Sequence, residues 1–288
     1  METAVPDVIR LSDGGWEAAV APAFGGSLLF LRRAGADILR SAISANAVAA
    51  DPRNGACFPC VPYFGRLAGG LTVDGRRWPL YPTLPACDPA NPLHGEGWVS
   101  LWRASAQTPS SLTIGLEHAP SPGRFPFPYR AEQSLTLGDE GLTIFLSIES
   151  TGAAPMPAGL GLHPYFARVG DTRLAFSAER YWTPPDGPLS ALPDALGQGA
   201  GAPLPPSTRD HSYAGFGGAV AIESDGQRIL LKSDAPALHL YAPGGRDYYC
   251  LEPVTHLPGA FTGDAKMSTA RSLEPGERLS LTMFIGAA

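Results

Sequence analysis

Apolar and polar residues alternate at every second position over much of the chain. Between Ser111 and Leu116, for example, Leu112, Ile114 and Leu116 are apolar, whereas the residues between them are small or polar. In an extended strand this alternation turns one face toward a core and the other toward solvent. The same pattern predicts further strands at residues 16–20, 27–32, 131–137, 142–148, 237–241 and 278–285. The alternation therefore indicates a protein built mainly from β-strands.

Short loops that contain glycine join several of these segments. Asp74-Gly75 and Asp225-Gly226 each separate two short alternating segments. Asp-Gly is a favoured pair for the type I′ turn of a β-hairpin, because both residues of that turn must adopt a positive φ. The loop Gly138-Asp-Glu-Gly141 separates two longer alternating segments in the same way. We therefore predict an antiparallel hairpin at each of the three places.

No segment carries the pattern of a long helix, in which apolar residues recur at three- and four-residue intervals between capping residues. The 34 Gly and 30 Pro residues among 288 also disfavour long helices, because Gly is flexible and Pro lacks a backbone donor. Strand segments follow one another along the whole chain without an intervening linker. We therefore expect one all-β domain over residues 1–288, arranged as a large antiparallel β-sandwich.

Charge and hydropathy exclude several classes of partner. The 21 basic and 27 acidic residues give a net charge of −6, whereas nucleic-acid-binding domains present a basic surface. No apolar stretch approaches the about 18 residues that a transmembrane helix needs, and the first residues lack the basic and apolar regions of a signal peptide. We therefore expect a cytoplasmic protein, a monomer or weak homodimer, that binds neither nucleic acid nor membranes.

The four cysteines do not suggest a disulfide scaffold or a metal site. Cys57 and Cys60 form a Cys-x-x-Cys pair, and Cys87 and Cys250 stand alone. A redox pair needs a helix N-terminus that lowers the thiol pKa, and a zinc site needs a second ligand pair. Neither feature is visible in the sequence, so we expect buried, reduced thiols and no metal.

Polar residues that a sandwich core does not need lie in four segments, each at the end of an apolar run or at a Gly/Pro turn. These segments are 58–66 with Arg66, 91–98 with His94, 159–166 with His163 and 250–256 with Glu252. Strand ends and turns are the places where β-sandwiches carry function. Each residue alone also has an ordinary structural explanation, such as a buried histidine, a solvated strand end or a turn residue.

Together, these segments resemble the aldose 1-epimerase, or galactose mutarotase-like, family. The matching stretches are Val61-Pro-Tyr-Phe-Gly-Arg66, Pro92-Leu-His-Gly-Glu-Gly-Trp98, Phe125-Pro-Phe-Pro-Tyr129, Gly161-Leu-His-Pro-Tyr-Phe166 and Leu251-Glu-Pro-Val-Thr-His256. They occur in the family's order. The resemblance implies a many-stranded β-supersandwich with a sugar-binding cleft on one concave face, a monosaccharide substrate and no cofactor.

Carried over position by position, the resemblance implies that Glu252 is the catalytic base and His163 the catalytic acid. It implies three substrate-binding residues: Arg66 and His94, which orient the sugar, and Asp210, which binds it. Apart from the resemblance, the aromatic rings of Trp98, Tyr165 and Phe166 could stack on a pyranose, and we take Trp98 as a candidate substrate-binding residue. Two positions depart from the family pattern, because Gly65 and Gly259 stand where relatives carry Asn. These departures leave the identity of the sugar open.

The residue types agree with this chemistry. Interconversion of α and β anomers needs a base that removes the proton from O1 and an acid that protonates the ring oxygen, and we expect the two on opposite sides of the hemiacetal. A carboxyl group with a pKa of about 4.3 and an imidazole with a pKa of about 6.5 can both serve near neutral pH. We therefore expect a bell-shaped pH dependence around neutrality and no need for a metal or nucleotide.

Three alternatives stay open. The substrate could be a phosphorylated or sulfonated hexose, for which Arg124, Arg130, Arg168 and Arg246 are candidate ligands. The protein could be a non-catalytic carbohydrate-binding protein, although binding alone does not need a paired acid and base. A metal-dependent sandwich enzyme would use His94, His163, His256 and Glu252 as ligands, but the His-x-His pair typical of cupins is missing.

Overall fold

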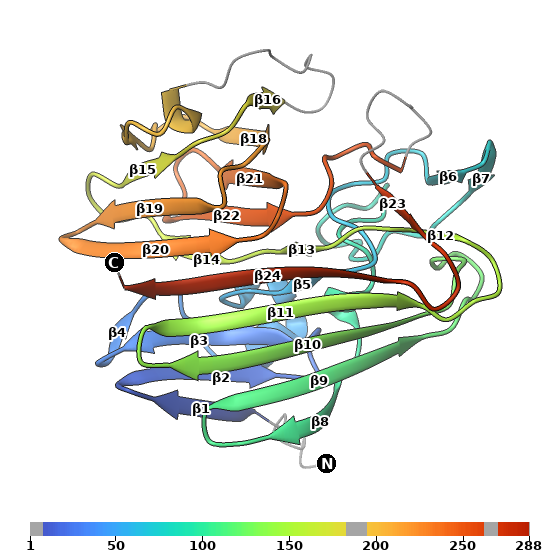
Figure 1. Cartoon of the computed structure of the whole chain (residues 1–288), viewed down its shortest axis with the longest axis horizontal. Coiled ribbons are helices and arrows are strands. Elements are labelled where there is room, and N and C mark those ends of the chain that lie inside the picture. The colour runs from blue at the N-terminus through green and yellow to red at the C-terminus, as the bar shows by residue number, and fades with distance from the viewer. Residues whose placement is uncertain (1–7, 183–194, 262–269, 288) are drawn as a thin grey trace.

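The computed structural model describes residues 8–182, 195–261 and 270–287, which form an almost entirely β-stranded protein (Figure 1). The described α-helix is one short element, α1 (Ala45–Ala50), whose first turn is capped by the Ser44 hydroxyl at 3.1 Å from the Ala47 N–H. Short 3-10 turns lie at Pro52–Asn54, Gly97–Val99 and Ala195–Gly197. The expected all-β antiparallel fold is confirmed. The sequence did not predict α1, because six residues are too few to display a helical period.

The largest sheet has nine strands, and its long members lie side by side in Figure 1. In spatial order they are β17 (Ala202–Pro203), β15 (Arg173–Phe176), β19 (Ala219–Ser224), β20 (Gln227–Ser233), β24 (Arg278–Ala287), β11 (Gly141–Ser150), β10 (Tyr129–Gly138), β9 (Ser111–His118) and β8 (Arg103–Gln107). Leu112, Ile114 and Leu116 of β9 are buried, as their alternation predicted. Alternation thus gives this sheet one face toward the core.

The three predicted hairpins are all present. Asp225 and Gly226 join β19 to β20 with φ angles of 49° and 74°. Asp74 and Gly75 join β6 (Leu71–Val73) to β7 (Arg76–Trp78) with φ angles of 48° and 74°. Both turns therefore have the two positive φ angles that a type I′ turn requires. The third hairpin joins β10 to β11.

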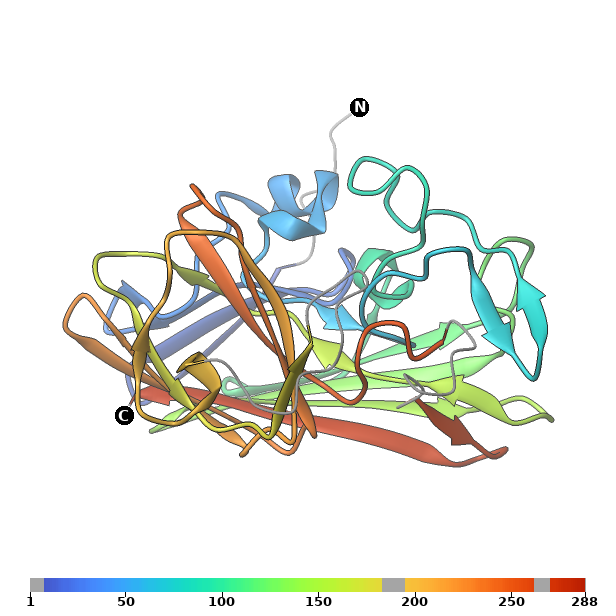
Figure 2. The ribbon, with the colours of Figure 1, turned by 90° about the horizontal axis from the view of Figure 1, so that it is seen from above.

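A seven-stranded sheet carries Asp210 and Glu252, and His163 lies between two of its strands. Its path is β16 (Arg180–Trp182), β18 (Arg209–Ala214), β21 (Ala237–Ala242), β22 (Tyr248–Val254), β13 (Gly161–Leu162) and β5 (Pro59–Cys60), and β14 (Tyr165–Ala167) also pairs with β22. Figure 2 shows the orange strands of this sheet rising from the layer of long red and green strands.

A four-stranded N-terminal sheet packs against the largest sheet. It consists of β1 (Ile9–Asp13), β2 (Trp16–Ala21), β3 (Ser27–Arg33) and β4 (Ala36–Asp37), and a further small sheet pairs β12 (Met156–Ala158) with β23 (Arg271–Leu273). The Trp16 indole N–H donates to the carbonyl oxygen of Asp139 at 3.0 Å, and the Gln133 amide donates to that of Gly26 at 3.0 Å. One buried apolar cluster runs from Leu11 to Ile285 and holds these layers together.

The cysteines and the helices bear on two expectations from the sequence, reduced thiols and the absence of a transmembrane helix. Cys57, Cys60 and Cys250 are buried, Cys87 is partly buried, and all four are free. Burial raises the pKa of the Cys57, Cys60 and Cys250 thiols, which therefore stay protonated and unreactive. Within the described residues, no helix is long and apolar enough to cross a membrane.

Candidate active site

The register of β18, β21 and β22 aligns side chains in two rows across the seven-stranded sheet. One row holds Ser212, His239 and Glu252. The next row holds Asp210, Tyr241, Cys250 and Tyr165. Residues two apart on a strand project to the same face, so both rows share one face of the sheet. We call this surface the catalytic face.

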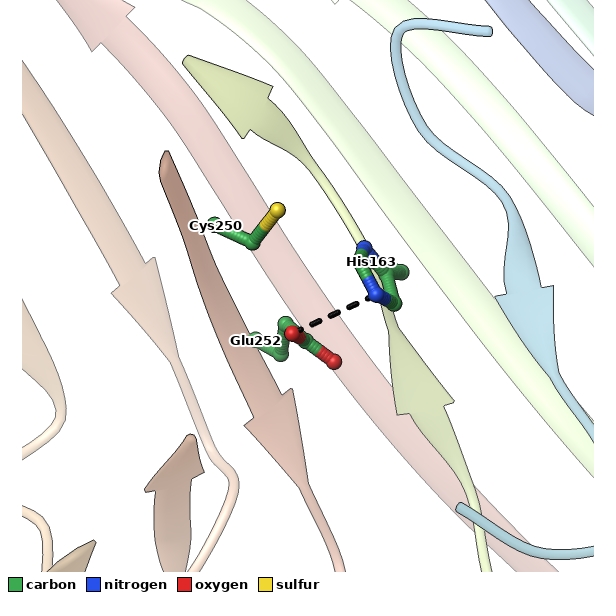
Figure 3. A group of neighbouring side chains, drawn as sticks. All are labelled: His163, Cys250 and Glu252. Atoms are coloured by element: carbon green, nitrogen blue, oxygen red, sulfur yellow. Dashed lines mark ion pairs between the residues drawn. The ribbon is translucent and has the colours of Figure 1, made fainter. Parts of the chain in front are cut away.

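Glu252 and His163 meet on the catalytic face. His163 lies between β13 and β14, and both of these strands pair with β22, which carries Glu252. His163 Nε2 is 3.3 Å from Glu252 Oε1, and the two side chains are only 7% and 1% exposed (Figure 3). The predicted acid and base are therefore in direct contact, rather than separated on opposite sides of a gap.

Burial changes the protonation of this pair. It raises the pKa of Glu252 well above its usual value, and the nearby charge of Asp210 acts in the same direction. It lowers the pKa of His163 well below its usual value, and His94 and His239 add to that shift. Desolvation thus disfavours both charged forms. Between the two pKa values the pair holds a single proton, which the two groups share.

The polar atoms of the pair that do not face each other have no partner among the described residues. They are His163 Nδ1 and Glu252 Oε2, and both are buried. Aromatic rings flank the imidazole: the ring centres of Phe58 and Tyr165 lie 4.5 and 4.8 Å from that of His163. An unpartnered buried polar atom is costly, and functional sites are where such atoms are expected, because a ligand can satisfy them.

His94 stands beside the pair in a backbone conformation that fixes its ring. Its φ is 56°, its Nδ1 accepts the Gly65 N–H at 3.2 Å, and its ring centre is 5.2 Å from that of His163. Because Nδ1 is an acceptor, the neutral ring carries its proton on Nε2. Burial, together with the charges of His239 and Arg66, lowers the pKa of His94 to about 3. His94 is therefore a neutral donor.

Trp98 does not have the predicted role. Its side chain is 0% exposed, and its N–H donates to the carbonyl oxygens of Leu93 and Gly95 at 3.0 and 3.1 Å. A fully buried indole offers no face to a sugar. The ring instead supports the loop that carries His94, to which it packs edge-on at 5.8 Å.

Arg66 is held by Asp88, a residue that the sequence did not single out. The Arg66 Nε donates to Asp88 Oδ2, while Asp88 Oδ1 accepts the N–H groups of Ala90 and Asn91 at 2.9 and 3.0 Å. Burial opposes ionisation of Asp88, but these hydrogen bonds outweigh it and lower its pKa to about 2. The Arg66 side chain is 52% exposed, and among the described residues only its Nε has a partner. Its terminal nitrogens can therefore bind a ligand.

Asp210 is held by a second residue that the sequence missed, His239. Asp210 Oδ1 lies 3.3 Å from His239 Nε2, and Ser212 Oγ lies 2.7 Å from His239 Nδ1. Burial alone would raise the pKa of Asp210, but the hydrogen bond from His239 and the charges of His239 and Arg66 lower it. Asp210 is therefore an ionised, 49% exposed acceptor at the edge of the site. The only sequence signal for His239 was a polar residue between Leu238 and Leu240.

His256 has a structural role. Its Nε2 accepts the Phe64 N–H at 2.9 Å, and its Nδ1 lies 2.9 Å from the Leu257 carbonyl oxygen, so the ring is neutral with its proton on Nδ1. Burial lowers its pKa to about 4. Both ring nitrogens are occupied by the backbone. This arrangement contradicts the alternative in which His256 is a metal ligand.

One group within the described residues has the composition of a metal site. Ligand atoms of His163, Cys250 and Glu252 all lie within 4.8 Å of one another, and Figure 3 shows Cys250 and Glu252 projecting from the same strand. A cysteine ligand must be a thiolate, whereas burial raises the pKa of the Cys250 thiol. Without a metal ion, Cys250 is therefore a small, uncharged neighbour of the acid–base pair.

The structure thus brings together Glu252, His163, His94 and Asp210, with Arg66 close enough to affect the pKa of the last two. Residues 7–285 match the sequence model of a family described as aldose 1-epimerase. The chain belongs to the aldose 1-epimerase family. It is also 32% identical over 219 residues to YphB, an uncharacterized protein of Escherichia coli K12. The matched region covers 70% of this chain and 73% of that protein.

Solved structures of other family members share the fold. A candidate aldose 1-epimerase of Escherichia coli K12 superposes with a TM-score of 0.86 at 29% identity, over 98% of both chains. A homologue from C. elegans has a TM-score of 0.79 at 16% identity, over 98% of both chains. A galactose 1-epimerase of Lactobacillus acidophilus NCFM has a TM-score of 0.76 at 18% identity, over 99% of this chain and 96% of that one. The galactose mutarotase-like β-sandwich is therefore confirmed.

Exchange of Asp88 for asparagine is expected to loosen Arg66. The amide can still accept the backbone N–H groups of Ala90 and Asn91, but it carries no charge for the guanidinium. We expect Asp88→Asn to raise the KM for sugar roughly five-fold and to change kcat less. The control is Asp37→Asn, which removes an exposed ion pair with Arg32 and should leave KM unchanged. An unchanged KM in steady-state polarimetry of Asp88→Asn would contradict the positioning role.

Proposed function

We propose that the protein is an aldose 1-epimerase that interconverts the α and β anomers of a free, neutral aldose by general acid–base catalysis. The observation that carries this proposal is the buried contact between His163 Nε2 and Glu252 Oε1, 3.3 Å apart. A base and an acid that share one proton suit a reaction that moves one proton off the substrate and another onto it. Asp210, His94 and Arg66 supply polar groups around this pair.

The contact between the two groups suits the geometry of a hemiacetal. O1 and the ring oxygen of an aldopyranose are bonded to the same carbon, so they lie closer together than the two heavy atoms of a hydrogen bond. Neighbouring acid and base groups can therefore each face one of the two oxygens. The step starts from the form of the pair in which the shared proton lies on His163. Glu252, then a carboxylate, accepts the O1 proton while His163 gives its proton to the ring oxygen, and the bond between C1 and the ring oxygen breaks. The product is the open-chain aldehyde.

Ring closure reverses the two proton transfers. After rotation about the C1–C2 bond, His163 removes the proton from the C5 hydroxyl while Glu252 protonates the aldehyde oxygen. The C5 oxygen then attacks the other face of C1 and forms the opposite anomer. Each enzyme group returns to its starting state, so the cycle consumes no proton and needs no cofactor. The neutral donor His94 and the acceptor Asp210 hold the sugar hydroxyls during the rotation.

The contacts of the arginines that were candidate ligands for an anionic sugar favour a neutral substrate instead. Arg130 forms an ion pair with Glu117, with 3.5 Å between Arg130 Nη2 and Glu117 Oε1. The Arg168 guanidinium donates to the carbonyl oxygens of Pro243 and Pro205. These two side chains thus have partners other than Glu252 and His163. Arg124 and Arg246 are exposed, and among the described residues none of these four arginines is joined to Glu252 or His163 by a hydrogen bond or ion pair.

The test is the optical rotation of freshly dissolved α-D-glucose and α-D-galactose with the purified protein. We expect the approach to anomeric equilibrium to accelerate in proportion to protein concentration and to persist in excess EDTA. Saturable binding without acceleration would instead identify a carbohydrate-binding protein. Loss of activity in EDTA would favour the metal-dependent alternative. Exchange NMR with hexose 6-phosphates and sulfonated hexoses tests the charge of the substrate.

A further inference from the structure

Tyr241 is an aromatic side chain on the catalytic face that the mechanism above does not use. It lies two residues after His239 on β21, and it is the direct neighbour of Asp210 on β18 and of Cys250 on β22. We propose that Tyr241 is the platform on which the apolar face of the sugar stacks, and hence a specificity-determining residue. This inference rests on the proposed function of the same site.

The register puts Tyr241 within the reach of a sugar held at the acid–base pair. Glu252 is the neighbour of His239, and Tyr241 is one side-chain step further along the same strand. Two residues of an antiparallel strand span about 6.8 Å, which is comparable to the width of one pyranose. A sugar whose anomeric carbon contacts Glu252 can therefore cover Cys250 and reach the ring of Tyr241.

Other aromatic rings around the site are already occupied. Phe58, Phe64 and Tyr165 are 1%, 3% and 4% exposed, so none of them offers a face to a ligand. Tyr248 is partly exposed, but its ring contacts the Arg40 guanidinium at 4.8 Å and the Tyr165 ring at 5.3 Å. Tyr241 is also partly exposed, and no ring or cation contact joins it to another described residue.

The surroundings of Tyr241 suit a neutral, polar ligand with one apolar face. Partial burial raises the pKa of Tyr241 to about 12, and the neighbouring Tyr248, Cys250, Asp210 and Glu252 add to this shift, so the phenol stays neutral at any working pH. The face of an aromatic ring carries partial negative charge and attracts the C–H groups of a pyranose. Asp210, on the adjacent strand, can accept hydrogen bonds from hydroxyl groups at the edge of the same sugar. Face and edge of one ligand would thus be recognised by neighbouring residues.

The test separates the ring of Tyr241 from its hydroxyl. We expect Tyr241→Ala to raise the KM for the preferred aldose about ten-fold while kcat changes no more than about three-fold, because stacking acts in ground and transition states alike. Tyr241→Phe keeps the ring and should stay within about two-fold of wild type in both constants. The control is Tyr81→Ala, which removes a 63% exposed tyrosine outside the catalytic face and should change neither constant. The platform role is wrong if KM is unchanged in Tyr241→Ala. It is also wrong if KM rises as much in Tyr241→Phe as in Tyr241→Ala.

A second measurement distinguishes failure of this inference from failure of the proposed function. The probes are 1,5-anhydro-D-glucitol and 1,5-anhydro-D-galactitol, which keep the pyranose faces but lack O1 and so cannot undergo anomerisation. Calorimetric binding that weakens about ten-fold in Tyr241→Ala supports the platform even if the wild-type protein has no epimerase activity. Epimerase activity with equal probe affinity in wild type and Tyr241→Ala overturns the platform alone. Neither activity nor probe binding in the wild type overturns both.

Discussion

Replacing Glu252 by glutamine is expected to slow anomer interconversion at least about a hundred-fold, the lower end of what a general base contributes. The amide keeps the shape of the carboxyl group and its hydrogen bonding, but it cannot accept the proton from O1. Binding of the sugar should therefore stay within a few-fold of wild type. Polarimetry measures the rate, and calorimetry with an anhydro sugar measures the binding.

The same exchange should not unfold the protein. Burial raises the pKa of Glu252, which means that the folded state disfavours the charged carboxylate. A neutral amide avoids this desolvation, so we expect a melting temperature equal to or above that of wild type. Glu149→Gln is the matched control, because Glu149 pairs with Arg278 at 2.8 Å on the nine-stranded sheet and has no role in catalysis. If Glu252→Gln kept more than about a tenth of the activity, the general-base role would be untenable.

Exchange of His163 for asparagine is expected to cause a comparable loss. Asparagine can occupy part of the space between Phe58 and Tyr165, but it cannot deliver a proton to the ring oxygen. The nearest other imidazole, His94, uses Nδ1 as an acceptor and is held by Gly65, so it does not replace the acid. We expect at least a hundred-fold loss of kcat, about the lower end for general acid catalysis. Activity within about ten-fold of wild type would reassign the acid.

The pH profile of the wild-type enzyme tests whether the Glu252–His163 pair is active only when it holds one proton. Activity falls at low pH when a second proton enters the pair, and it falls at high pH when the shared proton is lost. Burial lowers the pKa of His163 and raises that of Glu252. The two limbs of the bell should therefore not fall at the unperturbed pKa values of about 4.3 and 6.5. Limbs at those two unperturbed values would contradict this electrostatic description.

The sequence by itself determined the strand content, the hairpins and the family. Alternation is a local property, so Leu112, Ile114 and Leu116 revealed the buried face of β9 without knowledge of any other strand. Asp225-Gly226 and Asp74-Gly75 revealed their turns for the same reason, because a positive φ at both positions is a local requirement. The six-residue helix α1 was missed, since its six residues make fewer than two turns and cannot show the repeat that identifies a helix.

The sequence also identified Glu252, His163, His94, Arg66 and Asp210 as candidate site residues, but only through their resemblance to a family pattern. The structure places Glu252, His163, His94 and Asp210 around one catalytic face, with Arg66 nearby. Local pattern could not show that Glu252 and His163 would be in contact. That contact follows from the pairing of β22 with β13 and β14, which lie about ninety residues earlier in the chain.

Only the tertiary structure decided which groups support these residues and how the pair is protonated. His239 meets Asp210, and Asp88 meets Arg66, through strand register and a loop fold that no short motif encodes. The burial of Trp98 removed it from the binding surface, whereas Tyr241 stayed partly exposed. The pKa shifts of Glu252 and His163 depend on desolvation by segments far apart in sequence. The local sequence pattern therefore determined the strands and turns. Packing between distant segments determined the contacts, exposure and charge of the site residues.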